Sequence, residues 1–233
     1  MKHFSNKYIY TFSAIMVVLV ATLLSLAATL LQPAQAKNLE VEKKRNMLES
    51  INVEATPANA EELYSKYINE SYVLNSLGEP LEGVDAFNVV LRNEQRKKLE
   101  EQALPVFRAT ADGGETVIII PVEGKGLWGP IYGYVSLKSD MNTIYGVNFD
   151  HKGETPGLGA EINTSEFEDQ FIGKKLFDDN EFISVQVVKG GAPEGNVHSV
   201  DAISGGTITS KGLEKMIFDC LIKYNGYLLK NRI

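Results

Sequence analysis

The stretch ETVIIIPV, residues 115–122, is the point at which the sequence changes from helical spacing to a strand-like composition. Its β-branched run from Val117 to Ile120 suits a buried strand. Further strands are expected over 131–137, 143–149 and 182–188, which hold alternating or clustered apolar residues between turn residues. These segments predict that a sheet forms the centre of the fold.

Helical spacing appears on both sides of this region. The clearest helix follows it, with apolar residues at steps of 3, 1, 3, 1 and 3: Leu213, Met216, Ile217, Cys220, Leu221 and Tyr224. This spacing predicts an amphipathic helix that packs one face onto the sheet. Other helices are expected over 38–51, 60–77, 85–103 and 167–172. The predicted fold is α+β, a twisted and mostly antiparallel sheet flanked by helices.

An apolar run near the N-terminus, Ile9 to Leu31, contains 23 residues and no charge. A helix of that length spans about 34 Å, which exceeds the hydrocarbon core of about 30 Å. A cleaved signal peptide is the alternative, because residues 34–36 (Ala-Gln-Ala) have the small-x-small pattern of a cleavage site. A signal core is usually shorter, so we expect a retained transmembrane helix. Basic residues lie on both sides of the run, and charge alone does not set its orientation.

The predicted organisation has four parts. They are an N-terminal tail over 1–8, a transmembrane helix over 9–31, a helical linker with leading helices over 32–104, and the sheet-containing domain over 105–230.

The composition describes a globular and acidic chain with a formal net charge of −7. Residues 1–36 hold two lysines and no acid, so the remainder has 21 basic and 30 acidic residues, a balance of −9. Such a surface repels phosphate backbones, and nucleic-acid binding is therefore disfavoured. The one cysteine, Cys220, forms no internal disulfide and ligates no iron–sulfur cluster by itself. We expect it to be a buried structural thiol.

Standard catalytic and metal motifs are missing from the sequence. The segment 124–129 matches G-x-G-x-x-G, but a dinucleotide site needs a helix to begin at the third glycine. Here Pro130 and a strand-like segment follow, so a turn between two strands is expected. The histidines are not spaced as a metal pair, and His198 is expected to be an exposed loop residue. We therefore predict no catalytic residue and no metal site.

Two glycine-rich segments remain, over 151–160 and 201–210. In the first, two glycines flank Leu158 and would let a ligand approach the main chain. The second precedes the terminal helix, where a phosphate would meet unpaired amides and the positive end of the helix dipole. A Ser/Thr N-cap after a glycine-rich loop is the structural alternative, and physical reasoning alone favours it.

Taken together, the two segments resemble a known family. Asp201-x-x-Ser204-Gly205-Gly206-Thr207 resembles the attachment motif of FMN-binding domains in sodium-pumping respiratory complexes, where a flavin transferase joins the threonine hydroxyl to the phosphate of FMN. The motif normally has alanine at the position of Gly206. Residues 126–133, 154–159 and 189–193, with the membrane helix, resemble the C subunit of the Na+-translocating NADH:quinone reductases. The G subunit of the related Rnf ion-translocating complex is the alternative, and 127–132 with 189–193 favour the C subunit.

The resemblance implies a covalent FMN on Thr207 and assigns the residues around it. Ser204, Gly205 and Gly206 would lie at the attachment point, Asp201 would serve recognition by the flavin transferase, and the ring contacts would come from Thr155, Gly157, Leu158, Gly159 and Trp128. A core position is the alternative for Trp128.

It also implies an electron-transfer subunit in the bacterial inner membrane, with its domain on the periplasmic side and other membrane subunits as partners. Nothing resembles an NADH or quinone site, so the chain should not catalyse the overall reaction alone. The membrane helix has no acid, and sodium passage through this subunit alone is not expected. Two readings outside the family stay open: an exported binding domain without cofactor, and a structural scaffold.

Overall fold

The computed structural model describes residues 5–232, so residues 1–4 of the predicted tail lie outside the described residues. The chain divides into two compact units, Met1–Lys43 and Lys44–Ile233. Helix α1, Asn6–Glu49, is continuous and includes Pro33, so the expected helix over 38–51 is confirmed as far as Glu49. An 18-residue window of α1 has a mean hydropathy of 2.6, and α1 is long and apolar enough to cross a membrane.

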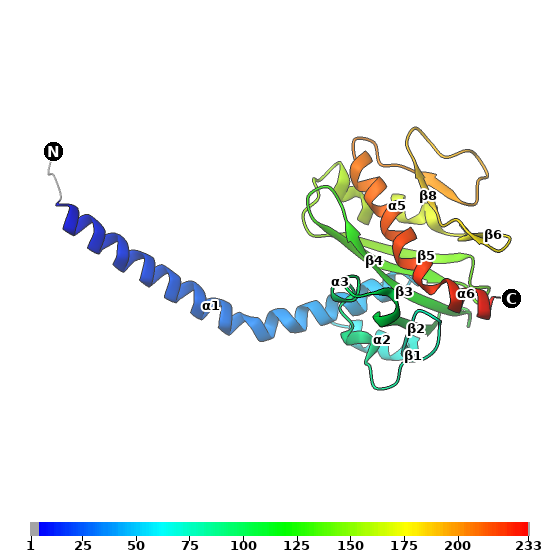
Figure 1. Cartoon of the computed structure of the whole chain (residues 1–233), viewed down its shortest axis with the longest axis horizontal. Helices are drawn as coiled ribbons and strands as arrows, with labels where there is room; N and C mark the ends of the chain where they lie inside the picture. The colour runs from blue at the N-terminus through cyan, green and yellow to red at the C-terminus, as the bar shows by residue number, and fades with distance from the viewer. Residues whose placement is uncertain (1–4, 233) are drawn as a thin grey trace. The chain divides into compact units, whose positions relative to one another are not determined.

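The centre of the second unit is an antiparallel sheet. Within residues 5–232 it has five strands in the order β1-β2-β3-β4-β5, each paired with the next along the chain (Figure 1). The strands are β1 Ile68–Leu74, β2 Leu104–Thr110, β3 Thr116–Lys125, β4 Pro130–Leu137 and β5 Ile144–His151. The predicted α+β fold with a mostly antiparallel sheet is confirmed.

Shorter elements complete the unit. Two antiparallel strands, β6 Phe177–Asp178 and β7 Glu181–Phe182, pair with each other, and β8 Gln186–Val188 pairs in parallel with β9 Ser199–Asp201. The helices are α2 Ala60–Tyr67, α3 Leu91–Glu94, α4 Ser165–Glu168, α5 Thr207–Leu221 and α6 Asn225–Asn231. The 3-10 turns are η1 Ala86–Asn88, η2 Leu99–Glu101, η3 Gly159–Asn163, η4 Asp169–Phe171 and η5 Ile222–Tyr224.

The apolar run in β3 is buried because the sheet is covered on both faces. On one face, Ile118, Ile120 and Val122 share a core with the apolar stripe of α5, which crosses the sheet in Figure 1. Against the other face lies the segment at the end of α1, where Ser50 Oγ and Ser136 Oγ are hydrogen bonded at 2.8 Å. Strands buried on two sides read as continuous apolar runs, which explains the composition of 117–120.

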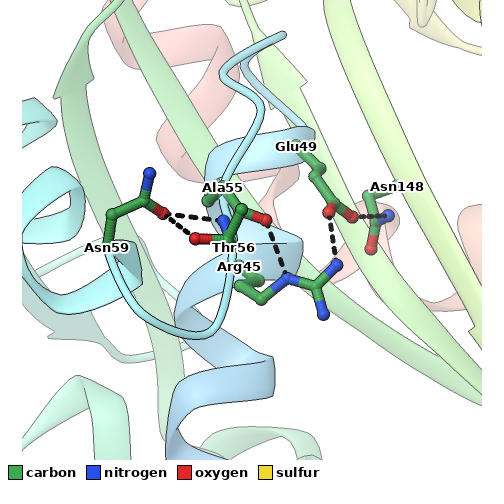
Figure 2. Close-up of polar contacts among 6 residues, drawn as sticks. All are labelled: Arg45, Glu49, Ala55, Thr56, Asn59 and Asn148. Carbon is green, nitrogen blue, oxygen red and sulfur yellow. Dashed lines mark hydrogen bonds and ion pairs between the residues drawn. The ribbon is translucent and has the colours of Figure 1, made fainter.

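The end of α1 is fixed to the sheet by the polar contacts shown in Figure 2. Arg45 donates from Nε to the carbonyl of Ala55 at 2.9 Å and from Nη2 to Glu49 Oε1 at 3.1 Å. The other oxygen of Glu49 accepts from Asn148 Nδ2, in β5, at 3.1 Å. These hydrogen bonds therefore hold residues 44–49, the last part of α1, within the second unit.

Two of the expected helices are wrong in part. The helix expected over 60–77 ends at Tyr67, because the residues that follow pair with β2 as strand β1. The helix expected over 85–103 is reduced to short turns around α3. Strand β1 falls within 32–104, so that range is not helical throughout, and the predicted domain boundaries stay a prediction.

The strand expected over 182–188 is interrupted. Ser184 has a φ of 64°, a left-handed conformation that breaks a strand, and it separates β7 from β8. The helix expected over 167–172 is present as α4 followed by a 3-10 turn. The turn expected at 124–129 is confirmed, because it joins β3 to β4.

Candidate functional site

The two glycine-rich segments meet at the start of α5. A Cβ atom on Gly205 would lie 2.6 Å from Leu158 Cδ2, and one on Gly206 would lie 3.1 Å from the carbonyl oxygen of Leu158. A Cβ on Gly159 would lie 2.4 Å from Thr209 Oγ1. The structure thus brings together Leu158, Gly159, Gly205 and Gly206, which the sequence placed in one candidate site.

Helix α5 begins without a side-chain cap. Gly206 occupies the N-cap position, and in the described part of the chain this residue provides no side-chain cap for the first amides of the helix. The structural alternative of a Ser/Thr N-cap is therefore wrong for this helix. Uncapped amides and the helix dipole together favour an anion at this position.

Four hydroxyl groups surround the helix start, and they differ in accessibility. Thr209 is 1% exposed and donates to Glu154 Oε2 at 2.6 Å. Ser210 is fully buried, and its Oγ accepts from the amide of Ile203 at 3.1 Å. Ser204 is exposed and Thr207 is half-buried. Thr207 is thus the reachable hydroxyl on the helix itself.

A buried carboxylate, Glu154, links the site together. Its Oε1 accepts from the amides of Trp128 at 2.8 Å and Gly129 at 3.3 Å. Burial alone would raise the pKa of Glu154, but the bonds from Thr209 and from the amides of 127–129 hold that pKa below its usual value. The residue is therefore a carboxylate at neutral pH. Sequence reasoning did not select it.

The segments that meet at this site carry exposed apolar side chains, which together are called the apolar rim. Leu127, Trp128, Leu158 and Ile208 are all exposed, and Trp128 has 70% of its surface accessible. Trp128 is therefore not a core residue, and the core alternative is wrong. Exposed apolar and aromatic side chains of this kind provide a surface for a planar ring system.

Thr155 and Gly157 lie on the same loop and are exposed. The carbonyl of Thr155 accepts from the amides of Leu158 and Ala160, both at 3.1 Å, which holds the loop as a compact turn. The amide of Gly157 donates to Glu161 Oε1 at 2.8 Å, so it is already engaged within the loop. Gly159 is buried against Thr209.

Asp201 is at the end of β9 and contacts a different loop. Its Oδ1 accepts from the amide of Ala192 at 2.6 Å, and its own amide donates to Gln170 Oε1 at 2.8 Å. The contact fixes the segment 189–193 beside the attachment motif.

Other candidate chemistry is not supported by the geometry. Among residues 5–232, no group of three or more His, Cys, Asp or Glu side chains could hold a metal ion. Cys220 is buried, as expected for a structural thiol. His198 is half-buried, and its Nδ1 is hydrogen bonded to the carbonyl of Lys175 at 2.8 Å.

Comparison with known proteins gives consistent matches. Residues 126–222 match the family model of the FMN-binding domain. The C subunit of the Na(+)-translocating NADH-quinone reductase of Vibrio campbellii is 33% identical over 213 residues, which cover 82% of this chain and 81% of the relative.

Two crystal structures are similar. The C subunit of the same reductase from Parabacteroides distasonis is 45% identical with a TM-score of 0.78, over 85% of this chain and 96% of that one. NqrC of Shewanella oneidensis is 28% identical with a TM-score of 0.69, over 82% of this chain and 97% of that one. Sequence and fold thus agree with the predicted family, and this chain is a member of the family of C subunits of the Na(+)-translocating NADH-quinone reductase.

Proposed function

We propose that this chain is an electron-transfer subunit of a Na+-translocating NADH:quinone reductase and carries FMN in a phosphoester bond to Thr207. One observation carries the proposal: the reachable hydroxyl of Thr207 lies at the uncapped start of α5, beside an exposed apolar rim. The match of 126–222 to the FMN-binding domain supports flavin as the ligand.

The helix start suits the phosphate of the bound flavin. The phosphoester would lie at the first amides of α5, where the helix dipole favours negative charge. Gly205 has a φ of 74°, a conformation that favours glycine, and together with Gly206 it keeps the chain beside Thr207 free of bulk. Ser204 is exposed on the same loop.

Attachment is a group transfer without redox change. The donor is a flavin dinucleotide, in which the FMN phosphate is part of a pyrophosphate. The bond from Thr207 Oγ1 to phosphorus forms as the pyrophosphate bond breaks, and a nucleoside monophosphate and a proton are released. A flavin transferase is the partner for this step, and we propose Asp201 as part of its recognition motif, with Ala192 held beside it.

The bound FMN supplies the one-electron chemistry, and the protein supplies position and retention. Leu158 and Trp128 offer exposed apolar contact to the ring, and Thr155 offers a hydroxyl. Gly157 and Gly159 shape the same loop through their contacts with Glu161 and Thr209. A tether that survives changes of redox state prevents loss of the flavin.

We propose that residues 9–31 are a retained membrane anchor and that 105–230 form the flavin-carrying domain, with β1 completing its sheet. The bacterial inner membrane is the proposed location, with the domain on the periplasmic side. The partners are other membrane subunits of the reductase, and the chain does not catalyse NADH oxidation alone.

Replacing Thr207 tests the proposal directly. The full chain, produced together with a flavin transferase, should carry acid-stable flavin, and Thr207→Ala should carry none. Thr207→Ser keeps a hydroxyl and should retain part of the flavin. The measurements are flavin absorbance after denaturation and the mass of the peptide 201–211. Acid-stable flavin in the Thr207→Ala chain would show that the attachment residue is wrong. A wild-type chain without flavin would favour the cofactor-free readings.

A further inference from the structure

Glu154 is a buried carboxylate at the junction of three segments of the candidate site. It is 5% exposed and lies in the loop that follows β5. One oxygen accepts from the amides of Trp128 and Gly129 in the β3–β4 turn, at 2.8 and 3.3 Å. The other oxygen accepts from Thr209 in the first turn of α5, at 2.6 Å.

Two glycines let the carboxylate reach both partners. A Cβ on Gly126 would lie 2.6 Å from Glu154 Oε1, and a Cβ on Gly159 would lie 2.6 Å from Glu154 Oε2. Real side chains do not approach so closely, so any larger residue at these positions would displace the carboxylate. The packing is therefore built around Glu154.

Thr209 connects this carboxylate to the attachment residue. It follows Thr207 by two positions in the same helical turn, and that turn has no side-chain cap. The hydrogen bond from Thr209 to Glu154 is therefore a side-chain contact that fixes the start of α5. A charge-assisted bond of 2.6 Å is stronger than a bond between neutral groups.

We propose that Glu154 is a positioning residue for flavin attachment, which ties the β3–β4 turn to the first turn of α5 and thereby holds the hydroxyl of Thr207 at the surface. The inference rests on the proposed function. Glu154 contacts none of the reacting atoms and takes no proton from Thr207. Its effect is on the position of the acceptor oxygen when the phosphoester bond forms.

The same contact also selects the acceptor. By engaging the Thr209 hydroxyl in the interior, Glu154 removes it as a competitor, while the Ser210 hydroxyl is already bound to Ile203. Of the threonines in the first turn, only Thr207 keeps a reachable hydroxyl in the described structure.

The test uses the purified full chain without flavin, in detergent, with a purified flavin transferase and flavin adenine dinucleotide. Glu154→Ala should lower the kcat/KM of attachment by about 10- to 100-fold, because misplacement of a reacting group by about 1 Å costs this much. Glu154→Gln should restore part of the rate, since its amide oxygen still accepts from the turn and its NH2 group still contacts Thr209.

Thr209→Val provides an independent variant that keeps the side-chain shape and removes the donor. It should slow attachment without changing the attached residue. The double variant Glu154→Ala with Thr209→Val should be no slower than Glu154→Ala, because both changes break the same contact. The mass of the peptide 201–211 identifies the modified residue in each case.

Glu94→Gln is the matched control. The Glu94 carboxylate has a side chain 12% exposed, accepts from the amide of Ala103 at 2.8 Å and pairs with Lys97. It therefore fixes a loop as Glu154 does, but in the segment 91–103. Glu94→Gln should lower the unfolding temperature and leave the kcat/KM of attachment unchanged.

Three outcomes separate the claims. Wild-type kcat/KM in folded Glu154→Ala, with flavin on Thr207, overturns this inference and leaves the proposed function intact. An equal slowing in the Glu94 control at equal stability shows a general structural effect and also overturns it. A wild-type chain that takes no flavin on Thr207 overturns the proposed function itself.

Discussion

At the scale of single residues, Glu168 has a pKa that the folded structure raises, and the effect on stability can be measured. It is half-buried at the end of α4, and its Oε1 accepts from the amide of Phe149 at 2.6 Å. Burial and the nearby carboxylates of Glu49, Asp169 and Asp150 raise the pKa of Glu168 to about 7, against the opposing effect of the Phe149 amide. Below about pH 7, the folded protein therefore favours the protonated form of Glu168.

A pH dependence of stability follows from this shift. Between an ordinary pKa of 4.5 and the folded value of about 7, the folded state binds more protons than the unfolded state. The stabilisation is present at low pH and is lost as the pH rises through about 7. Glu168→Gln keeps the acceptor for Phe149 and removes the titration. Its free energy of unfolding relative to wild type should rise by about 1–3 kcal/mol between about pH 5 and pH 8.

Urea unfolding of the full chain in detergent measures this difference. Asp140→Asn is the control, because hydrogen bonds from Thr143 and Asn142 lower the pKa of Asp140, despite the opposing effect of burial. Its titration therefore lies below the tested range, and its difference from wild type should stay constant. A constant difference for Glu168→Gln as well would contradict the pKa shift.

Thr207 and Glu154 differ in how far the sequence alone could predict their roles. Thr207 was predicted from a contiguous motif, which the sequence displays directly. Glu154 accepts hydrogen bonds from amides that are 25 and 26 residues away in the sequence and from a hydroxyl that is 55 residues away. No local sequence pattern therefore predicts its role. The signal that the sequence did offer was the acidic residue Glu154 in a loop rich in glycine, close to a second glycine-rich loop.

At the scale of elements, helix α5 lies unusually close to β3, and glycine makes this possible. A Cβ on Gly212 would lie 2.5 Å from the carbonyl of Lys125, and a Cβ on Gly124 would lie 2.7 Å from Met216 Cβ. Both positions are in regular elements, where glycine by itself is unfavourable. Close packing between helix and strand outweighs that local cost.

Alanine substitution separates the two effects. Gly212→Ala should destabilise the fold by about 1–3 kcal/mol, because the added methyl collides with main-chain atoms, although alanine is the better helix former. Gly226→Ala in α6 meets its nearest atom at 3.5 Å and should stabilise by up to about 1 kcal/mol. Unfolding midpoints in urea compare the two variants. A Gly212→Ala chain as stable as wild type would show that the helix shifts away without cost.

Elements differed in how well the sequence predicted them. Strand β3 and helix α5 were predicted because each carries a long apolar pattern that matches its burial. The residues of strand β1 were assigned to a helix, and strand β2 was not recognised. Both strands are defined by their pairing with each other, and pairing between distant segments overrides local spacing.

At the scale of the whole molecule, charge gives a weaker argument about membrane orientation than the sequence suggests. Four basic residues follow the apolar run, between positions 37 and 45: Lys37, Lys43, Lys44 and Arg45. Lys44 is 8% exposed and pairs with Glu61 at 3.1 Å. Arg45 is bound to Glu49 and to the carbonyl of Ala55. In the folded second unit, two of the four charges are thus already compensated.

The proposed orientation, with the second unit outside the cell membrane and the N-terminus in the cytoplasm, can be tested by labelling. Exposed Glu82 and Ser5 lie after and before the apolar run. Each is replaced by cysteine in a chain whose buried Cys220 is alanine. In spheroplasts, a membrane-impermeant maleimide should label Glu82→Cys at once and Ser5→Cys only after permeabilisation. The reverse pattern would place the flavin domain in the cytoplasm. Labelling of both without permeabilisation would indicate that the N-terminal helix does not span the membrane. An intact mass that includes residues 1–36 would separately exclude cleavage after Ala36.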